Sequence, residues 1–210
     1  MDIDFGVDAP RGLKHSQTIF KMLSGLDYTE HHSRMDRMFP VVLLKENIPV
    51  EFITDLAVNI TAVEALVGGE MQINKIEKFD FLLKHRRSIT VKTPRGKGPY
   101  ELKGPTPAAF LYHKEATFIS RENKEKQAKD LYYMYFILRY APDSNAILDE
   151  ISQFSREGYF KSVSENLAKF FEGVSSSGCL MIERENGPDE VIHDLRQDIF
   201  ERFSKLREAL

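Results

Sequence analysis

The chain has 210 residues, of which 42% are hydrophobic and 29% are charged, and both values are ordinary for a globular protein. With 29 basic and 32 acidic residues, the formal net charge is −3, which argues against a nucleic-acid coat protein or a polybasic membrane binder. The single cysteine, Cys179, excludes an intrachain disulfide and a cysteine-based metal cluster.

The same cysteine usage fits a reducing compartment, so we expect a cytoplasmic protein. No apolar run approaches the ~20 residues that a helix needs to span a bilayer, and we expect no membrane contact. Acidic residues at Asp2, Asp4 and Asp8 stand where a signal peptide would carry its basic and apolar parts.

The first half of the chain predicts strands mixed with short helices. Alternating or apolar runs predict strands at 3–7, 28–32, 38–44 and 48–54, and helical spacing predicts helices over 12–24 and 61–70. Residues 45–47 have the length of a hairpin turn. The segment 79–83 stays open between strand and helix, and 88–92 and 100–103 predict two strands around a Pro-Gly turn.

The second half predicts helices. Thr106-Pro107 is a favourable helix start, and helical spacing follows over 107–120, 122–140, 144–156, 160–173 and 188–208. Residues 175–178 predict a flexible joint, and the aromatic residues between 132 and 140 are interpreted as core. We therefore predict an α+β fold in which a core of small mixed sheet over 1–105 precedes a helical subdomain over 106–210.

Asp2 and Asp4 are the first candidate site residues. On a strand, residues two apart point to the same face, so both carboxylates project together while Ile3 and Phe5 pack on the other side. A divalent cation would relieve the repulsion between them, and oxygen ligands favour Mg²⁺ or Mn²⁺. The alternative is a solvated acidic N-terminus.

Glu51 is the next candidate, because it is a carboxylate between apolar residues on a predicted strand. If this strand lies beside the first, Glu51 completes a cluster of three carboxylates that can hold two metal ions for phosphoryl chemistry. The alternative is a solvent-facing residue on a half-buried strand.

Two cations and a carboxylate form the third candidate group. Lys114 and Arg121 are seven residues apart, so on a continuous helix they share a face and could bind phosphate oxygens. Asp130 could pair with one of them and fix its orientation. The alternative is an exposed, salt-bridged helix surface.

Taken in order, these motifs resemble the AbiEii/AbiGii-toxin type nucleotidyltransferases, which belong to the DNA polymerase β-like nucleotidyltransferase superfamily. The resemblance covers about residues 1–140. It consists of Asp2-Ile3-Asp4-Phe5, Val-Glu-Phe-Ile-Thr at 50–54, Pro-Thr-Pro-Ala-Ala-Phe-Leu-Tyr-His-Lys at 105–114, Arg121, and Lys-Asp-Leu-Tyr-Tyr at 129–133.

The resemblance implies a transfer of a nucleotide from a nucleoside triphosphate to an acceptor hydroxyl on tRNA, protein or a small molecule. It implies Mg²⁺ or Mn²⁺ as cofactor, and a toxin role with an antitoxin as partner. It assigns catalysis and metal binding to Asp2, Asp4 and Glu51. It assigns nucleotide binding to Lys114, Arg121 and Asp130.

One family motif is missing from the printed sequence. Members carry a Gly-Ser pair roughly ten residues before Asp-x-Asp, where backbone amides bind phosphate, and this sequence starts too late to include it. We therefore expect either an upstream start codon or a loss of the motif. The loss would favour a catalytically silent interaction module with the same fold, and a third interpretation is an unrelated helical regulator.

Overall fold

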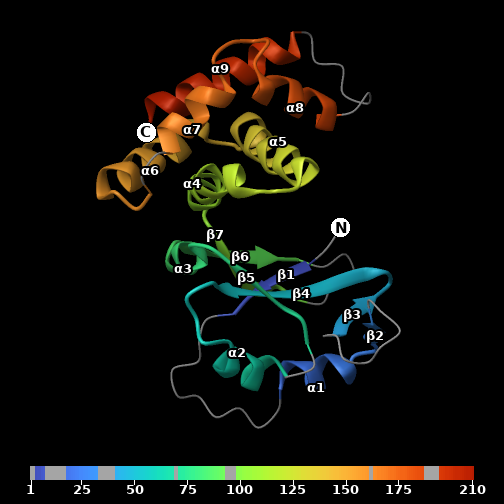
Figure 1. Cartoon of the computed structure of the whole chain (residues 1–210). Helices are drawn as coiled ribbons and strands as arrows, with labels where there is room; N and C mark the ends of the chain where they lie inside the picture. The colour runs from blue at the N-terminus through green and yellow to red at the C-terminus, as the bar shows by residue number, and fades with distance from the viewer. Residues whose placement is uncertain are drawn as a thin grey trace. The chain divides into compact units, whose positions relative to one another are not determined.

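The computed structural model describes residues 3–7, 18–32, 41–68, 71–92, 98–160, 163–186 and 194–210. The chain divides into two compact units, residues 1–84 and residues 85–210. Among the described residues, the first unit holds a five-stranded mixed sheet with three helices, and the second holds a two-stranded sheet and the remaining helices (Figure 1). The predicted α+β class, with a small mixed sheet and a helical C-terminal half, is confirmed. No helix in these ranges is long and apolar enough to cross a membrane.

Strand β4 (Ile48–Asp55) is the central strand of the five-stranded sheet. It pairs in parallel with β1 (Ile3–Gly6) along one side, and along the other side with antiparallel β3 (Val41–Lys45) and then with parallel β5 (Ile73–Ile76). Strand β2 (Thr29–His32) extends the sheet beyond β3. The predicted strands over 28–32 and 48–54 match β2 and β4. The predicted strand over 38–44 matches β3 from residue 41 onward, and residues 38–40 lie outside the described residues. Strand β5 was not predicted.

The turn between β3 and β4 has two residues, Glu46 and Asn47, and both have positive φ angles of 53° and 63°. This is the backbone of a tight hairpin turn whose twist matches that of the paired strands. Pro49 is the second residue of β4, close to the turn, although β4 itself is not an edge strand.

Helices α1 (Ile19–Ser24) and α2 (Ile60–Val67) lie on one side of this sheet (Figure 1). Thr18 and Asn59 cap their first turns, and Gly68 ends α2 with a φ of 116°, as its sequence predicted. The predicted helix 12–24 is confirmed from residue 19 onward, and residues 12–17 lie outside the described residues. The buried core here consists of Val7, Leu43, Val50, Phe52, Val63, Val67 and Met71.

Helix α3 (Phe79–Lys84) resolves the ambiguity at 79–83 in favour of a helix. The Asp55 carboxylate at the end of β4 accepts hydrogen bonds from the backbone N–H of Asp80, at 2.9 Å, and of Ala57, at 2.8 Å. Burial alone would raise the pKa of Asp55, but these backbone donors outweigh burial and lower it. Gly6 permits the close packing, because a Cβ there would lie 2.8 Å from the Phe79 ring.

The second unit begins with the hairpin of β6 (Arg86–Val91) and β7 (Tyr100–Pro105). Every strand residue except Gly104 is exposed. The predicted boundary after residue 105 follows this hairpin, whereas the compact units separate before it. Thr106 connects β7 to α4 (Pro107–Thr117), and its hydroxyl accepts a hydrogen bond from Ala109 at 3.1 Å.

After α4 come the 3₁₀ turn η1 (Phe118–Ser120) and α5 (Lys124–Tyr140), then α6 (Ser144–Glu157), α7 (Val163–Phe170), α8 (Ser177–Asn186) and α9 (Leu195–Glu208). Helix α5 packs against α4, α6, α8 and α9. The Asp198 carboxylate of α9 accepts hydrogen bonds from Tyr135 and Arg139 of α5, at 2.7 Å and 2.5 Å, and from Arg202, at 3.0 Å. This network fastens α5 to α9.

Two interpretations of the second half are wrong. The segment 175–178, predicted as a flexible joint, contains the start of α8, and Gly178 there is buried against the Phe170 carbonyl and the Phe171 ring. The aromatic residues of α5 were assigned to the core, but only Tyr135 is buried, whereas Tyr133, Phe136 and Tyr140 are exposed. Tyr135 lies on the face of Leu131 and Leu138, and the other rings lie on the opposite face.

Glu115 of α4 is the most unusual core residue, because its side chain is fully buried. Neither of its carboxyl oxygens has a hydrogen-bond partner in the described part of the chain. Burial without a partner disfavours the charged form, and it raises the pKa of Glu115 well above its usual value. Burial therefore favours the neutral form of this carboxyl.

This buried acid predicts that the stability of the protein depends on pH. The folded-state pKa lies above the unfolded one, so the stabilising contribution is complete below the unfolded pKa and is lost as pH rises through the folded pKa. Glu115→Gln keeps the shape without the ionisation. We expect the free energy of unfolding of this variant, relative to that of the native chain, to increase as pH rises above the pKa that Glu115 has in the unfolded chain.

Denaturant titrations across this pH range measure the difference. Glu122→Gln is the matched control, because Glu122 is exposed and its replacement should give a difference that does not vary with pH. A constant difference for Glu115→Gln as well would contradict the neutral, buried carboxyl.

Candidate functional site

The two described carboxylates of the predicted metal site lie on neighbouring strands. Parallel pairing of β1 with β4 places the Cα of Asp4 opposite the Cα of Glu51. Residues in register across a sheet share a face, so both side chains project to the same side. The next pair in register is Phe5 and Phe52, whose side chains point to the opposite face of the sheet. Their rings stack there with centroids 6.0 Å apart.

A residue that sequence reasoning missed holds Glu51 in place. The Asn74 side-chain amide donates a hydrogen bond to Glu51 Oε2 at 2.8 Å, and Gln72 in turn donates to Asn74 Oδ1 at 3.1 Å. Asn74 lies on β5, whose register partner on β4 is Ile53. Since Ile53 is two residues from Glu51, Asn74 shares the face of the two carboxylates.

Asp2, the third predicted carboxylate, lies outside the described residues, so the predicted cluster of three stays a prediction. Within the described ranges, no group of three or more His, Cys, Asp or Glu side chains is placed to hold a metal ion. The pair Asp4 and Glu51 matches the donor set of Mg²⁺, which binds through one or two carboxylates and keeps several waters. Asp4 is exposed and Glu51 is half-buried, so solvent reaches this face.

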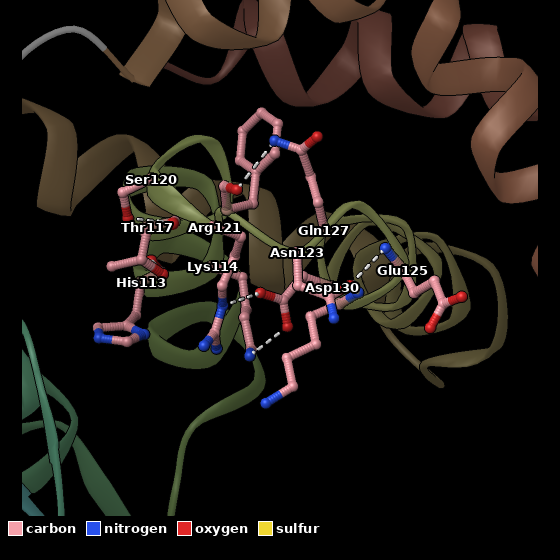
Figure 2. A network of polar contacts seen from close by, with 11 residues as sticks. His113, Lys114, Thr117, Ser120, Arg121, Asn123, Glu125, Gln127 and Asp130 are labelled. Carbon is pink, nitrogen blue, oxygen red and sulfur yellow. Dashed lines mark hydrogen bonds and ion pairs between the residues drawn. The ribbon is translucent and has the colours of Figure 1, made fainter.

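The three predicted nucleotide-binding residues meet in the second unit (Figure 2). Lys114 Nζ lies 2.5 Å from Asp130 Oδ1, and Arg121 Nε lies 3.0 Å from Asp130 Oδ2. Asp130 therefore binds both cations, one through each oxygen, where pairing with one was predicted. Its side chain is 7% exposed, against 15% for Lys114 and 35% for Arg121, which does not fit an exposed surface salt bridge.

Lys114 and Arg121 were expected to share a face if one continuous helix carried both, and that condition is not met. Helix α4 ends at Thr117, and Arg121 follows the 3₁₀ turn η1, so the seven-residue spacing does not bring the two side chains together. Asp130, from the next helix, does so instead. The two cations converge because α5 folds back beside α4.

Hydrogen bonds fix the connection between α4 and α5, and with it the position of Arg121 (Figure 2). The buried Gln127 amide of α5 donates to the Phe118 carbonyl at 3.1 Å, and Ser120 donates to the Thr117 carbonyl at 2.8 Å. Asn123 caps α5 by accepting from the N–H of Glu125 at 2.8 Å. Both ends of the connection are therefore held.

The group of Lys114, Arg121 and Asp130 carries two positive charges and one negative charge. Arg121 contacts Asp130 only through Nε, and its terminal amino groups have no hydrogen-bond partner among the residues that the structure describes. A guanidinium offers five donors, so these amino groups can still bind an anion. The geometry therefore suits a phosphate oxygen, with Asp130 as the residue that positions both cations.

Comparisons of this chain with protein-family models, with curated proteins and with solved structures give no match. The resemblance to the AbiEii/AbiGii-toxin type therefore stays a prediction, and the argument for a function depends on the residues themselves.

The paired cations predict a large stability effect at Asp130. Asp130→Asn removes the charge that neutralises Lys114 and Arg121 in a largely buried position, and we expect a loss of about 2–3 kcal/mol in the free energy of unfolding. Asp80→Asn is the matched control, because Asp80 pairs with Lys84 at 2.9 Å while both side chains are more than half exposed. Denaturant titration of both variants checks this, and equal losses would show that burial does not strengthen the Asp130 pairs.

Proposed function

We propose that this protein is a metal-dependent nucleotidyltransferase of the AbiEii/AbiGii-toxin type. The observation that carries the proposal is the in-register parallel pairing of β1 with β4, which places Asp4 beside Glu51 on one face of the sheet. The grouping of Lys114, Arg121 and Asp130 supports it, because the resemblance assigns the same three residues to nucleotide binding.

In this proposal Asp4 and Glu51, with Asp2, hold Mg²⁺ or Mn²⁺. The metal would supply charge stabilisation at the α-phosphate and would lower the pKa of the attacking hydroxyl. Asn74 positions Glu51 by donating a hydrogen bond to Oε2. The exposed position of Asp4 gives a nucleotide access to the pair.

The transfer itself is an in-line displacement. The acceptor hydroxyl oxygen forms a bond to the α-phosphorus, the bond from that phosphorus to the bridging oxygen breaks, and pyrophosphate leaves while the hydroxyl proton passes to solvent. In the second unit, the resemblance assigns Lys114 and Arg121 to phosphate oxygens of a nucleotide, whose negative charge they would offset. Asp130 acts through them as a positioning residue.

The acceptor and the biological role rest on the resemblance in residue order alone. It extends the proposal to tRNA or protein as the acceptor, and to an antitoxin as the partner. A reading frame for a small antitoxin-like protein beside this gene would support the toxin role independently of the chemistry.

Substitution of the carboxylate pair tests the proposal. Asp4→Asn and Glu51→Gln remove one metal ligand each, and we expect each to lower nucleotide transfer by about a hundredfold or more. Transfer is measured with Mn²⁺ or Mg²⁺ and each α-labelled triphosphate, and Mn²⁺ affinity by calorimetry. Glu46→Gln is the control, because Glu46 is an exposed carboxylate in the β3–β4 turn.

The pattern of results separates the candidate functions. Metal and nucleotide binding without transfer to tRNA or protein would support the silent interaction module. Absence of metal binding and of nucleotide binding by the native chain would contradict the proposal.

The hydrogen bond from Asn74 gives a second prediction for this site. Asn74→Ala removes the donor to Glu51 Oε2 without removing a ligand, and we expect Mn²⁺ affinity to fall by about tenfold, as for other residues that orient metal ligands. Calorimetry measures the affinity. An unchanged affinity would show that Asn74 does not position Glu51 for a metal.

A further inference from the structure

Three aromatic side chains of α5 are exposed along one side of the helix. Tyr133, Phe136 and Tyr140 are 39%, 49% and 42% exposed. With the exposed Lys126 and Lys129 they follow alternating steps of three and four residues over about four turns of helix. These five residues are called the α5 stripe.

Ring contacts connect the aromatic residues of the α5 stripe. The rings of Phe136 and Tyr140 have centroids 4.8 Å apart, and the half-buried Tyr132 beside the stripe has its ring centroid 6.3 Å from those of both Tyr133 and Phe136. Lys129 Nζ lies 5.6 Å from the centroid of Tyr133. Contiguous exposed aromatic surface of this kind is unusual on a monomer and is typical of an interaction surface.

The spacing and the charges indicate what covers the stripe. Steps of three and four residues form the seam by which two helices pack along their lengths. A nucleic acid is disfavoured, because the chain carries a net charge of −3 and the exposed Glu125 lies next to Lys126 in the first turn of α5. A second helix is therefore the better fit.

The order of residues in the stripe makes it complementary to itself. The cations Lys126 and Lys129 lie near the beginning of α5, whereas its end carries the Tyr140 ring, with the exposed carboxylate of Asp143 just beyond. Two copies placed antiparallel bring each beginning to the other's end, so cations meet an aromatic ring and a carboxylate. A parallel arrangement would bring lysine next to lysine.

We propose that the α5 stripe is the contact surface of a symmetric dimer in which two α5 helices pack antiparallel. Tyr133 of one copy faces Phe136 of the other, and Lys129 faces Tyr140. A two-fold axis that passes between positions 134 and 135 gives this register. Residues from the two alternating rows of the stripe then face each other, as antiparallel helix pairs require. The inference does not depend on the proposed transferase function.

Sedimentation velocity over a wide range of concentrations tests the dimer. We expect the mass to rise from 24.2 kDa to twice that value as the concentration increases. Because the dimer is symmetric, Phe136→Glu places two charges in the contact surface, and we expect it to raise the dissociation constant by about a hundredfold. Tyr140→Lys gives a second variant with the same direction, and circular dichroism checks that both fold.

Tyr100→Glu is the matched control, because Tyr100 is 48% exposed on β7 and lies outside the stripe. It should leave the dissociation constant unchanged. A native chain that stays monomeric at every concentration would overturn the proposal, and so would a dimer that Phe136→Glu and Tyr140→Lys do not weaken.

Disulfide cross-linking tests the orientation of the two helices. The native Cys179 is fully buried, so cross-links can be attributed to the introduced cysteines. We expect a mixture of Lys129→Cys and Tyr140→Cys chains to cross-link to each other faster than either chain cross-links to itself. Faster self-cross-linking of each variant would indicate parallel helices and would overturn the antiparallel arrangement.

Discussion

The placement of β4 between β1 on one side and β3 and β5 on the other is the constraint on which the first unit depends. A strand paired on both sides has each residue held in register, and a slip by one residue would turn Glu51 away from Asp4 and toward the core. The buried residues Phe52 and Thr54 alternate with Glu51, so the same packing that stabilises the sheet also specifies where the carboxylate points. The same alternation of residues in β4 therefore determines both the packing of the core and the orientation of Glu51.

In the second unit, different sides of helix α5 make different contacts. Asp130 turns toward α4 and binds two cations, Tyr135 and Arg139 reach Asp198 on α9, and the aromatic rings of the α5 stripe remain on the free side. Burial would raise the pKa of Asp198, but hydrogen bonds from Arg202, Tyr135 and Arg139 outweigh burial and lower it. The helix is therefore anchored by charged pairs at two points along its length.

Much of the fold could be predicted because strands and helices have fixed periods. The alternation in 48–54 was enough to predict both the strand and the face of Glu51, and Thr106-Pro107 was enough to start α4. The isoleucines of β5, Ile73 and Ile76, are three residues apart and show no strand alternation, so this strand and Asn74 were missed. Arg121 was expected beside Lys114 only on a continuous helix, and spacing alone cannot show that η1 follows α4 there. The aromatic residues of α5 were assigned to the core by residue type, although helical position decides burial.

The second unit also buries two carboxyl groups in opposite ways, and the contrast bears on its chemistry. Glu115 has no hydrogen-bond partner for its oxygens among the described residues, and burial raises its pKa, whereas Asp130 has a cation at each oxygen. A core that needed only stability could have replaced Asp130 and its partners with apolar residues at little cost, since buried ion pairs seldom stabilise more than well-packed hydrophobic groups. The retained group instead keeps a net positive charge, with the terminal amino groups of Arg121 still able to donate. That surplus of charge and donors is what an anion-binding site requires and a structural salt bridge does not.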